Sequence, residues 1–265
     1  MTAPAGEVRR VADRVLARIV AGKYPAGLRL PAEVDLATEF GCGRSTVREA
    51  LRYLAGLGVV RSRRGSGAMV LDFRREGTPE LLPQYLLTGR FDRPPITLAT
   101  ELLALRSLLA REAVRLAARY AQSLEEPRHI LAAAPSLADD TVAHAWNELE
   151  LFRALVFASG IWPAAWFANA FWGPVRELYQ VYAPTIGEVA PDYQEQMTTL
   201  LDLCAQRDEV AADRHLSRWL ARVDARLLAE LTRVLGPAAA SEPPPPHDRA
   251  GAAASKQKPS PTLAR

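Results

Sequence analysis

Residues 30–70 read LPAEVDLATEFGCGRSTVREALRYLAGLGVVRSRRGSGAMV, and this stretch decides the fold of the first part of the chain. Apolar residues recur at helical spacing on both sides of the GCG sequence, so we expect helices at residues 32–40 and 44–57 with a glycine turn between them. The strand-like runs 59–63 and 68–71 then flank a tight turn. This order of elements predicts a winged helix-turn-helix, which is a module that reads DNA.

Charge is distributed unevenly along the chain. Residues 1–75 contain 14 Lys or Arg against 7 Asp or Glu, whereas residues 76–236 contain 15 against 21. A basic first segment on an acidic body indicates a head that binds a polyanion and a body that does not touch it. The alternative explanation is a scatter of solvated surface charge.

The start of the second helix carries the residue types that contact DNA. In a helix-turn-helix this end enters the major groove, and here it consists of Arg44, Ser45, Thr46 and Arg48. An arginine can bind O6 and N7 of guanine through two hydrogen bonds. Ser45 and Thr46 can cap the helix and also contact a phosphate, because a helix N-terminus favours anions. We therefore expect all four residues to bind DNA.

The turn of the β-hairpin is the second candidate DNA contact. It contains Arg63, Arg64, Gly65 and Ser66, which place cations on a turn without bulky side chains. Such a tip can enter a minor groove or straddle phosphates. We therefore add these four residues to the predicted DNA-binding set.

Roughly residues 8–71 resemble the DNA-binding domain of the GntR family of bacterial transcription regulators. The sequence LPAEVDLATEFGCGRSTVREALRYLAGLGVVRSRRGSG is close to the family pattern LPSERxLAxxLGVSRxTVREALxxLxxxGxxxxxGxG. The resemblance implies that Arg44, Thr46 and Arg48 contact bases or phosphates and that Gly65 lies at the wing tip in the minor groove. One departure is Val34, which stands where the family usually has an arginine and so removes a DNA contact.

Composition divides the whole chain into four parts. An amphipathic helix is expected at 7–21, and we assign residues 1–73 to the winged helix-turn-helix domain. Residues 74–98 are rich in Pro and Gly and form the linker, and residues 236–265 form a Pro- and Ala-rich tail whose composition predicts disorder.

The remaining part, 99–235, shows no strand pattern and is expected to be an all-α bundle. One long helix is expected along Leu102–Tyr120, and further helices are expected at about 141–158, 163–182, 191–206 and 208–235. The fold class is therefore mainly α with a small β-hairpin wing.

The helical part resembles the C-terminal domain of the FadR subfamily of GntR regulators. The closest stretch is LFRALVFASG at residues 151–160. Many relatives bind a metal in this domain through an Asp and three His. The corresponding positions here hold Leu149, Arg153, Met197 and Trp219, none of which is a suitable ligand. We therefore expect neither a metal nor another cofactor.

All five tryptophans lie in this helical part. They are consistent either with a packed core and a dimer face or with an apolar ligand cavity, because both are lined by the same residue types. Arg106 and Arg153 can hold a carboxylate or phosphate in such a cavity. The resemblance implies that a fatty acyl-CoA is bound and that Trp219 lies in the sensing stretch. We therefore expect Arg106, Arg153 and Trp219 to bind an effector, which is an acyl-CoA or an organic acid.

The sequence as a whole predicts a transcription regulator. We expect a homodimer that binds a near-palindromic double-stranded operator under the control of a small-molecule effector. The alternative is an architectural or nonspecific DNA-binding protein that needs no effector. No phosphate-binding loop, metal-ligand pair or nucleophile elbow is present, so we expect no enzyme activity and assign no catalytic residue. The absence of a signal peptide and of a membrane span, together with only two cysteines, predicts a cytoplasmic protein without membrane contact.

Overall fold

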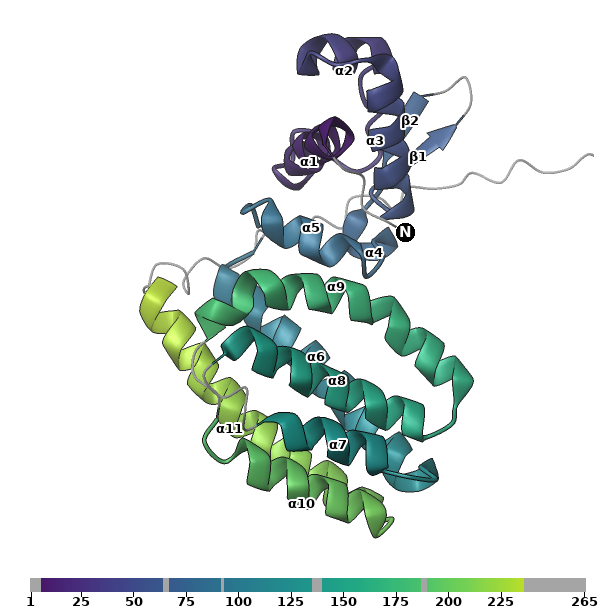
Figure 1. Cartoon of the computed structure of the whole chain (residues 1–265). Helices are drawn as coiled ribbons and strands as arrows, with labels where there is room; N and C mark the ends of the chain where they lie inside the picture. The colour runs from purple at the N-terminus through teal and green to yellow at the C-terminus, as the bar shows by residue number, and fades with distance from the viewer. Residues whose placement is uncertain (1–5, 64–66, 92, 135–139, 187–189, 236–265) are drawn as a thin grey trace, which may run out of the picture.

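The computed structural model describes residues 6–63, 67–91, 93–134, 140–186 and 190–235, and it consists of a small winged module above a helical bundle (Figure 1). The winged module is built from α1 (Glu7–Val20), α2 (Glu33–Phe40), α3 (Arg44–Gly56), β1 (Val60–Arg63) and β2 (Gly67–Val70). These bounds confirm the predicted helix-turn-helix and hairpin to within about one residue at each end. The inward faces of the three helices supply fully buried side chains, among them Val11, Val15, Leu36, Val47 and Leu54.

The wing contains a third segment of chain in addition to the hairpin strands β1 and β2. Residues 23–30 lie between α1 and α2, and Arg29 in this segment forms an isolated antiparallel bridge with Met69 of β2. Leu30 N donates to Ala68 O at 2.8 Å, and Val70 N donates to Leu28 O at 2.9 Å. The chain before α2 is therefore bonded along the second edge of β2 and fixes the wing to the module.

The turn after α3 is tightly packed against the chain that follows the wing. Gly58 has φ +74°, and a Cβ atom at this position would lie 1.9 Å from the backbone oxygen of Glu76. Thr78 N also donates to Leu57 O at 3.1 Å. The end of the recognition helix is therefore in direct backbone contact with the start of the linker.

The linker contains short helices that the sequence analysis did not predict. They are α4 (Phe73–Glu76) and α5 (Leu81–Leu87), and α6 (Pro95–Tyr120) begins earlier than expected. Leu81, Tyr85 and Leu86 are buried in the same apolar cluster as the winged module. A glycine follows each of these two helices: Gly77 follows α4, and Gly89, with φ +61°, comes shortly after α5. The module therefore extends beyond residue 73.

The bundle contains six of the described helices and no described strand (Figure 1). After α6 come α7 (Glu125–Ala133), α8 (Thr141–Ala158), α9 (Trp162–Ile186), α10 (Tyr193–Ala205) and α11 (Glu209–Leu235). This confirms the expected all-α body, although α7 was not predicted. Only Pro127 and Leu131 of α7 are buried, so its apolar stripe is too short to detect. None of the helices described here is long and apolar enough to cross a membrane.

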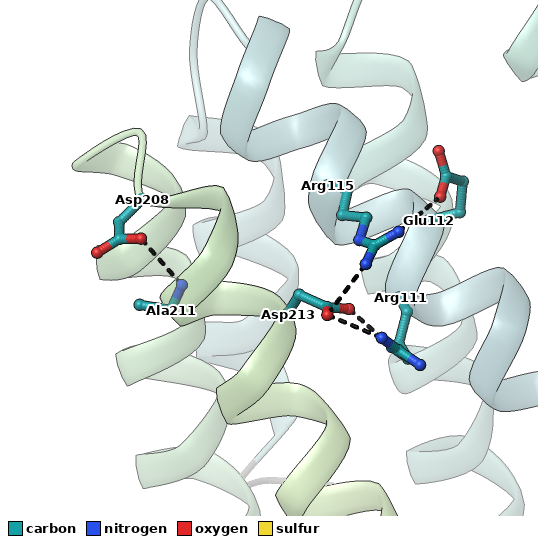
Figure 2. Close-up of polar contacts among 6 residues, drawn as sticks. All are labelled: Arg111, Glu112, Arg115, Asp208, Ala211 and Asp213. Atoms are coloured by element: carbon teal, nitrogen blue, oxygen red, sulfur yellow. Dashed lines mark hydrogen bonds and ion pairs between the residues drawn. The ribbon is translucent and has the colours of Figure 1, made fainter.

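Helices α6 and α11 are joined by an ion cluster (Figure 2). The carboxylate of Asp213 accepts hydrogen bonds from Arg111 Nε at 2.7 Å, from Arg111 Nη2 at 2.8 Å and from Arg115 at 3.2 Å. The hydrogen bond from Arg111 holds the pKa of Asp213 below its usual value. At its start, α11 is capped by Asp208, whose side chain accepts from Ala211 N at 2.9 Å. These contacts set the register of the two helices that carry Arg106 and Trp219.

Candidate DNA-binding surface and effector site

The first turn of α3 is open to solvent. Arg44 and Ser45 are exposed, and Thr46 is half-buried. The N-cap residue is Gly43, in an extended conformation with φ −75° and ψ 152°, and no side chain caps the helix. The expected capping by Ser45 or Thr46 is therefore wrong: both residues lie inside the helix, past the cap position. The free N–H groups of this turn remain available to an anion such as a DNA phosphate.

The two arginines of this turn differ in their partners. Arg48 is paired with Glu33 of α2, with Nη2 to Oε2 at 2.8 Å and Nε to Oε2 at 3.1 Å. This hydrogen bond raises the pKa of Arg48, and both side chains are exposed. Within the described part of the chain, no carboxylate pairs with Arg44. Arg44 can therefore donate to a base edge at once, whereas Arg48 must first leave Glu33.

Part of the predicted wing contact lies outside the described residues. Arg64, Gly65 and Ser66 belong there, and of Arg63 only the backbone, paired with Gly67, is described. The wing nevertheless shows two cations that the sequence analysis missed. Arg61 and Arg29 both lie opposite Met69, one on each side of β2, and residues directly opposite in antiparallel strands share a face. Both are exposed, so this face of the wing carries a pair of basic side chains.

Arg106 of the predicted effector set is already paired inside the bundle. On α6 it forms an ion pair with Asp224 of α11, and Ser107 Oγ lies 3.4 Å from the same carboxyl. Burial raises the pKa values of Asp224 and of the neighbouring Glu148 on α8, while the charge of Arg106 opposes both shifts. A ligand carboxylate would therefore have to compete with these protein carboxyls for Arg106.

Arg153 has a different environment on α8. Its guanidinium lies 4.9 Å from the ring centroids of both Phe157 and Trp172, and it reaches Glu150 at 3.3 Å. Its Nε is buried without a hydrogen-bond partner among the described residues. The described contacts do not bring Arg153 and Arg106 together as a single clamp.

Trp219 lies in a buried aromatic cluster that was not predicted from the sequence. The ring of Tyr193 on α10 lies 4.5 Å from that of His144 on α8 and 5.8 Å from that of Trp219 on α11. Trp219 is only 2% exposed, and its Nε1 and the Nδ1 of His144 are buried without partners among the described residues. Buried polar atoms are normally hydrogen-bonded to protein or to ordered water. Among the described residues no cluster of three His, Cys, Asp or Glu could hold a metal ion.

His144 is expected to make the stability of the bundle dependent on pH. Burial lowers its pKa from the usual 6.5, so the unfolded chain takes up a proton at a higher pH than the folded chain. The free energy of unfolding is therefore expected to fall as the pH drops below 6.5, until the folded-state pKa is reached. Urea unfolding as a function of pH measures this slope.

The matched variants are His144→Phe, which keeps an aromatic ring in the cluster, and His129→Gln, which changes an exposed histidine on α7. His144→Phe should remove this part of the pH dependence, and His129→Gln should keep it. An unchanged pH profile in His144→Phe would contradict this assignment.

Residues 7–70 match the family described as bacterial regulatory proteins, gntR family. The HTH-type transcriptional regulator Mce2R of Mycobacterium tuberculosis is 39% identical over 83 residues, which cover 31% of this chain and 35% of that protein. The fatty acid metabolism regulator protein of Yersinia pestis is 29% identical over 193 residues, which cover 72% of this chain and 79% of that protein. The first similarity is thus confined to about a third of Mce2R, whereas the second extends into the helical bundle.

One of the similar solved structures shares the fold. The Listeria monocytogenes protein Lar, which controls expression of the agr system, superposes with a TM-score of 0.51 at 16% identity, covering 88% of this chain and 100% of Lar. The Streptococcus agalactiae GntR structure gives a TM-score of 0.39 at 24% identity, covering 82% of this chain and 99% of that one. The likeness to Lar supports the arrangement of a winged module followed by a helical domain.

Proposed function

We propose that this chain is a FadR-like transcription regulator with a GntR-family DNA-binding domain, that it binds a near-palindromic operator as a homodimer in the cytoplasm, and that it responds to an acyl-CoA or organic acid in the α6–α11 bundle. The observation that carries the DNA-binding part is the open first turn of α3. It combines free backbone N–H groups with Arg44, which pairs with no carboxylate among the described residues, beside a wing that bears Arg29 and Arg61. One turn thus offers both a phosphate site and a donor for guanine.

The effector part of the proposal is supported by the interior of the bundle. Three N–H groups, Arg153 Nε, Trp146 Nε1 and Trp219 Nε1, are buried without partners among the described residues. Donors of this kind suit a ligand rich in acceptors, such as a carboxylate, a thioester carbonyl or a phosphate. The similarity of the bundle to a fatty acid metabolism regulator supports an acyl ligand.

A polar chain connects the winged module to the bundle. Arg9 on α1 binds Asp13 through its Nε at 2.8 Å and also donates to the side-chain oxygen of Gln84 on α5. The amide nitrogen of Gln84 reaches Oε1 of Glu177 on α9 at 3.4 Å. Gln84 is only 4% exposed, and α5 lies between the module and α9 (Figure 1). This relay supplies a contact through which a ligand in the bundle can change the position of the DNA-binding module.

The direct test is binding of the purified full chain to its own upstream DNA at fixed salt, with and without acyl-CoAs and organic acids. Specific binding that one of these ligands weakens supports the whole proposal. A ratio of specific to nonspecific affinity near one would instead support an architectural DNA-binding protein. Specific binding that none of the ligands changes would keep the regulator and overturn the proposed effector class.

Gln84→Leu is expected to uncouple the ligand from DNA. The variant keeps a side chain of similar size but removes both hydrogen bonds of the relay. Ligand-dependent changes in DNA affinity are typically about 5- to 150-fold, and the variant should reduce this response toward onefold while ligand affinity in the absence of DNA persists. The two titrations, with DNA and with ligand alone, measure these effects.

The matched control is Gln206→Leu, because Gln206 is exposed at the end of α10 and belongs to no relay. It should retain the full response to ligand. A Gln84→Leu protein with an undiminished response would show that coupling takes another route.

A further inference from the structure

The N-terminal half of α9 presents aromatic side chains to solvent. Trp162, Trp166 and Phe167 are 71, 66 and 61% exposed. The Trp162 and Trp166 rings lie 6.5 Å apart, and the rings of Phe167 and Phe171 lie 5.0 Å apart. Large aromatic side chains are usually buried to a high degree, and an exposed group of them marks a contact surface.

These side chains belong to one continuous stripe along the helix. Trp162, Trp166, Ala170 and Gly173 follow one another at spacings of four, four and three residues, with Phe167 beside them. At Gly173 an added Cβ would meet no atom within 4 Å, so the surface is open there as well. We call these five residues the α9 stripe.

Charge indicates what kind of partner fits the α9 stripe. Residues 162–175, WPAAWFANAFWGPV, contain no charged residue. The five residues of the α9 stripe therefore offer no charged group to a strongly acidic or basic partner. A second copy of the same surface, in contrast, meets it without burying like charges, and the small residues Ala170 and Gly173 allow two helices to approach closely.

The size of the surface is also suitable for pairing. Three aromatic side chains with these exposed fractions present roughly 300–500 Å², compared with about 800 Å² per partner in a standard interface. Buried Trp and other aromatic anchors dominate the binding energy of such interfaces. The α9 stripe therefore supplies the centre of an interface, to which surrounding residues such as the half-exposed Phe157 can add.

We propose that the α9 stripe is the surface through which two copies of this chain form a two-fold dimer. This inference rests on the proposed function, because reading a near-palindromic operator requires two modules held in a fixed relation. The stripe lies on the part of α9 that leads from α8, whereas Glu177, farther along the same helix, contacts α5 (Figure 1). One helix thus carries both the pairing surface and the contact to the DNA-binding module.

The test is the molar mass of the full chain without DNA, measured by sedimentation and light scattering across a wide concentration range. The wild-type protein should be a dimer. Trp166→Glu and Phe167→Glu should each raise the dissociation constant of the dimer by at least about 30-fold, since each places a charge at the centre of an apolar interface. Val210→Glu is the control, because Val210 is 66% exposed on α11 and lies outside the stripe.

A disulfide test covers the case in which a glutamate variant fails to fold. Ala170→Cys in a Cys42→Ser background should form a covalent dimer on mild oxidation, and Val210→Cys in the same background should not. Cys204 can stay in place, because burial raises the pKa of its thiol to about 12.

A monomeric wild-type protein, or a dimer that survives both glutamate substitutions, would overturn the proposal. A monomeric result would leave the stripe to another partner, and a surviving dimer would place the contact elsewhere. Because no DNA is present, failure to find an operator would count against the proposed function and not against this dimer.

Discussion

Arg44→Ala is expected to lower the affinity of the protein for its operator by about 5- to 150-fold, which corresponds to ~1–3 kcal/mol, and to relax the base preference at one position of each half-site. The reason is the position of Arg44 on the exposed first turn of α3, where no described carboxylate competes for its guanidinium. Fluorescence anisotropy with the operator and with single-base variants of it, at one salt concentration, measures both effects.

Arg52→Ala is the matched control on the same helix. Arg52 lies two turns beyond Arg44, is exposed and is paired with Glu49, so its removal should change affinity much less. A loss in Arg44→Ala that is equal for all sequences and lowers the salt dependence of binding would identify a phosphate contact instead of a base contact.

Gly58→Ala is expected to destabilise the winged module by more than ~2 kcal/mol. Two costs combine at this position: a left-handed backbone with φ +74° and a Cβ atom placed 1.9 Å from the carbonyl oxygen of Glu76. The neighbouring atom belongs to the backbone, so it cannot move aside as a flexible side chain would. Urea unfolding followed by circular dichroism measures the loss, which should appear as a lower midpoint.

Gly41→Ala separates the two costs. Gly41 ends α2 with a similar φ of +66°, but an added Cβ there meets no atom within 4 Å. Its substitution should cost only the backbone strain, ~1 kcal/mol. Equal losses in the two variants would mean that the contact between the α3 turn and α4 relaxes freely.

The sequence was sufficient to predict the winged module because its signals are local and agree with one another. The apolar period of α3, the glycine turn before it and the paired strands after it each fix a boundary. The short helices α4 and α5 escaped prediction because four to seven residues give too few turns for a period to appear. Their assignment depends on burial against the module, which is a tertiary property.

Partners far apart in the sequence could not be predicted either. The sequence places four candidate DNA contacts at the start of α3, but the pairing of Arg48 with Glu33 depends on how α2 crosses α3. Arg106 was expected to be free for a ligand, yet its partner Asp224 lies 118 residues away on α11. A periodic pattern indicates which face of a helix is buried, but it does not indicate which charged residue the neighbouring helix presents.

Glu33 competes with DNA for the guanidinium of Arg48, whatever DNA sequence the module binds. Breaking this exposed ion pair carries a small free-energy cost at any site, and only a site that offers Arg48 a good acceptor offsets that cost. The pair thus discriminates against random DNA without contacting it. Salt weakens the ion pair and the phosphate contacts together, so the affinity for the operator should fall less steeply with salt than the number of basic residues on the module implies.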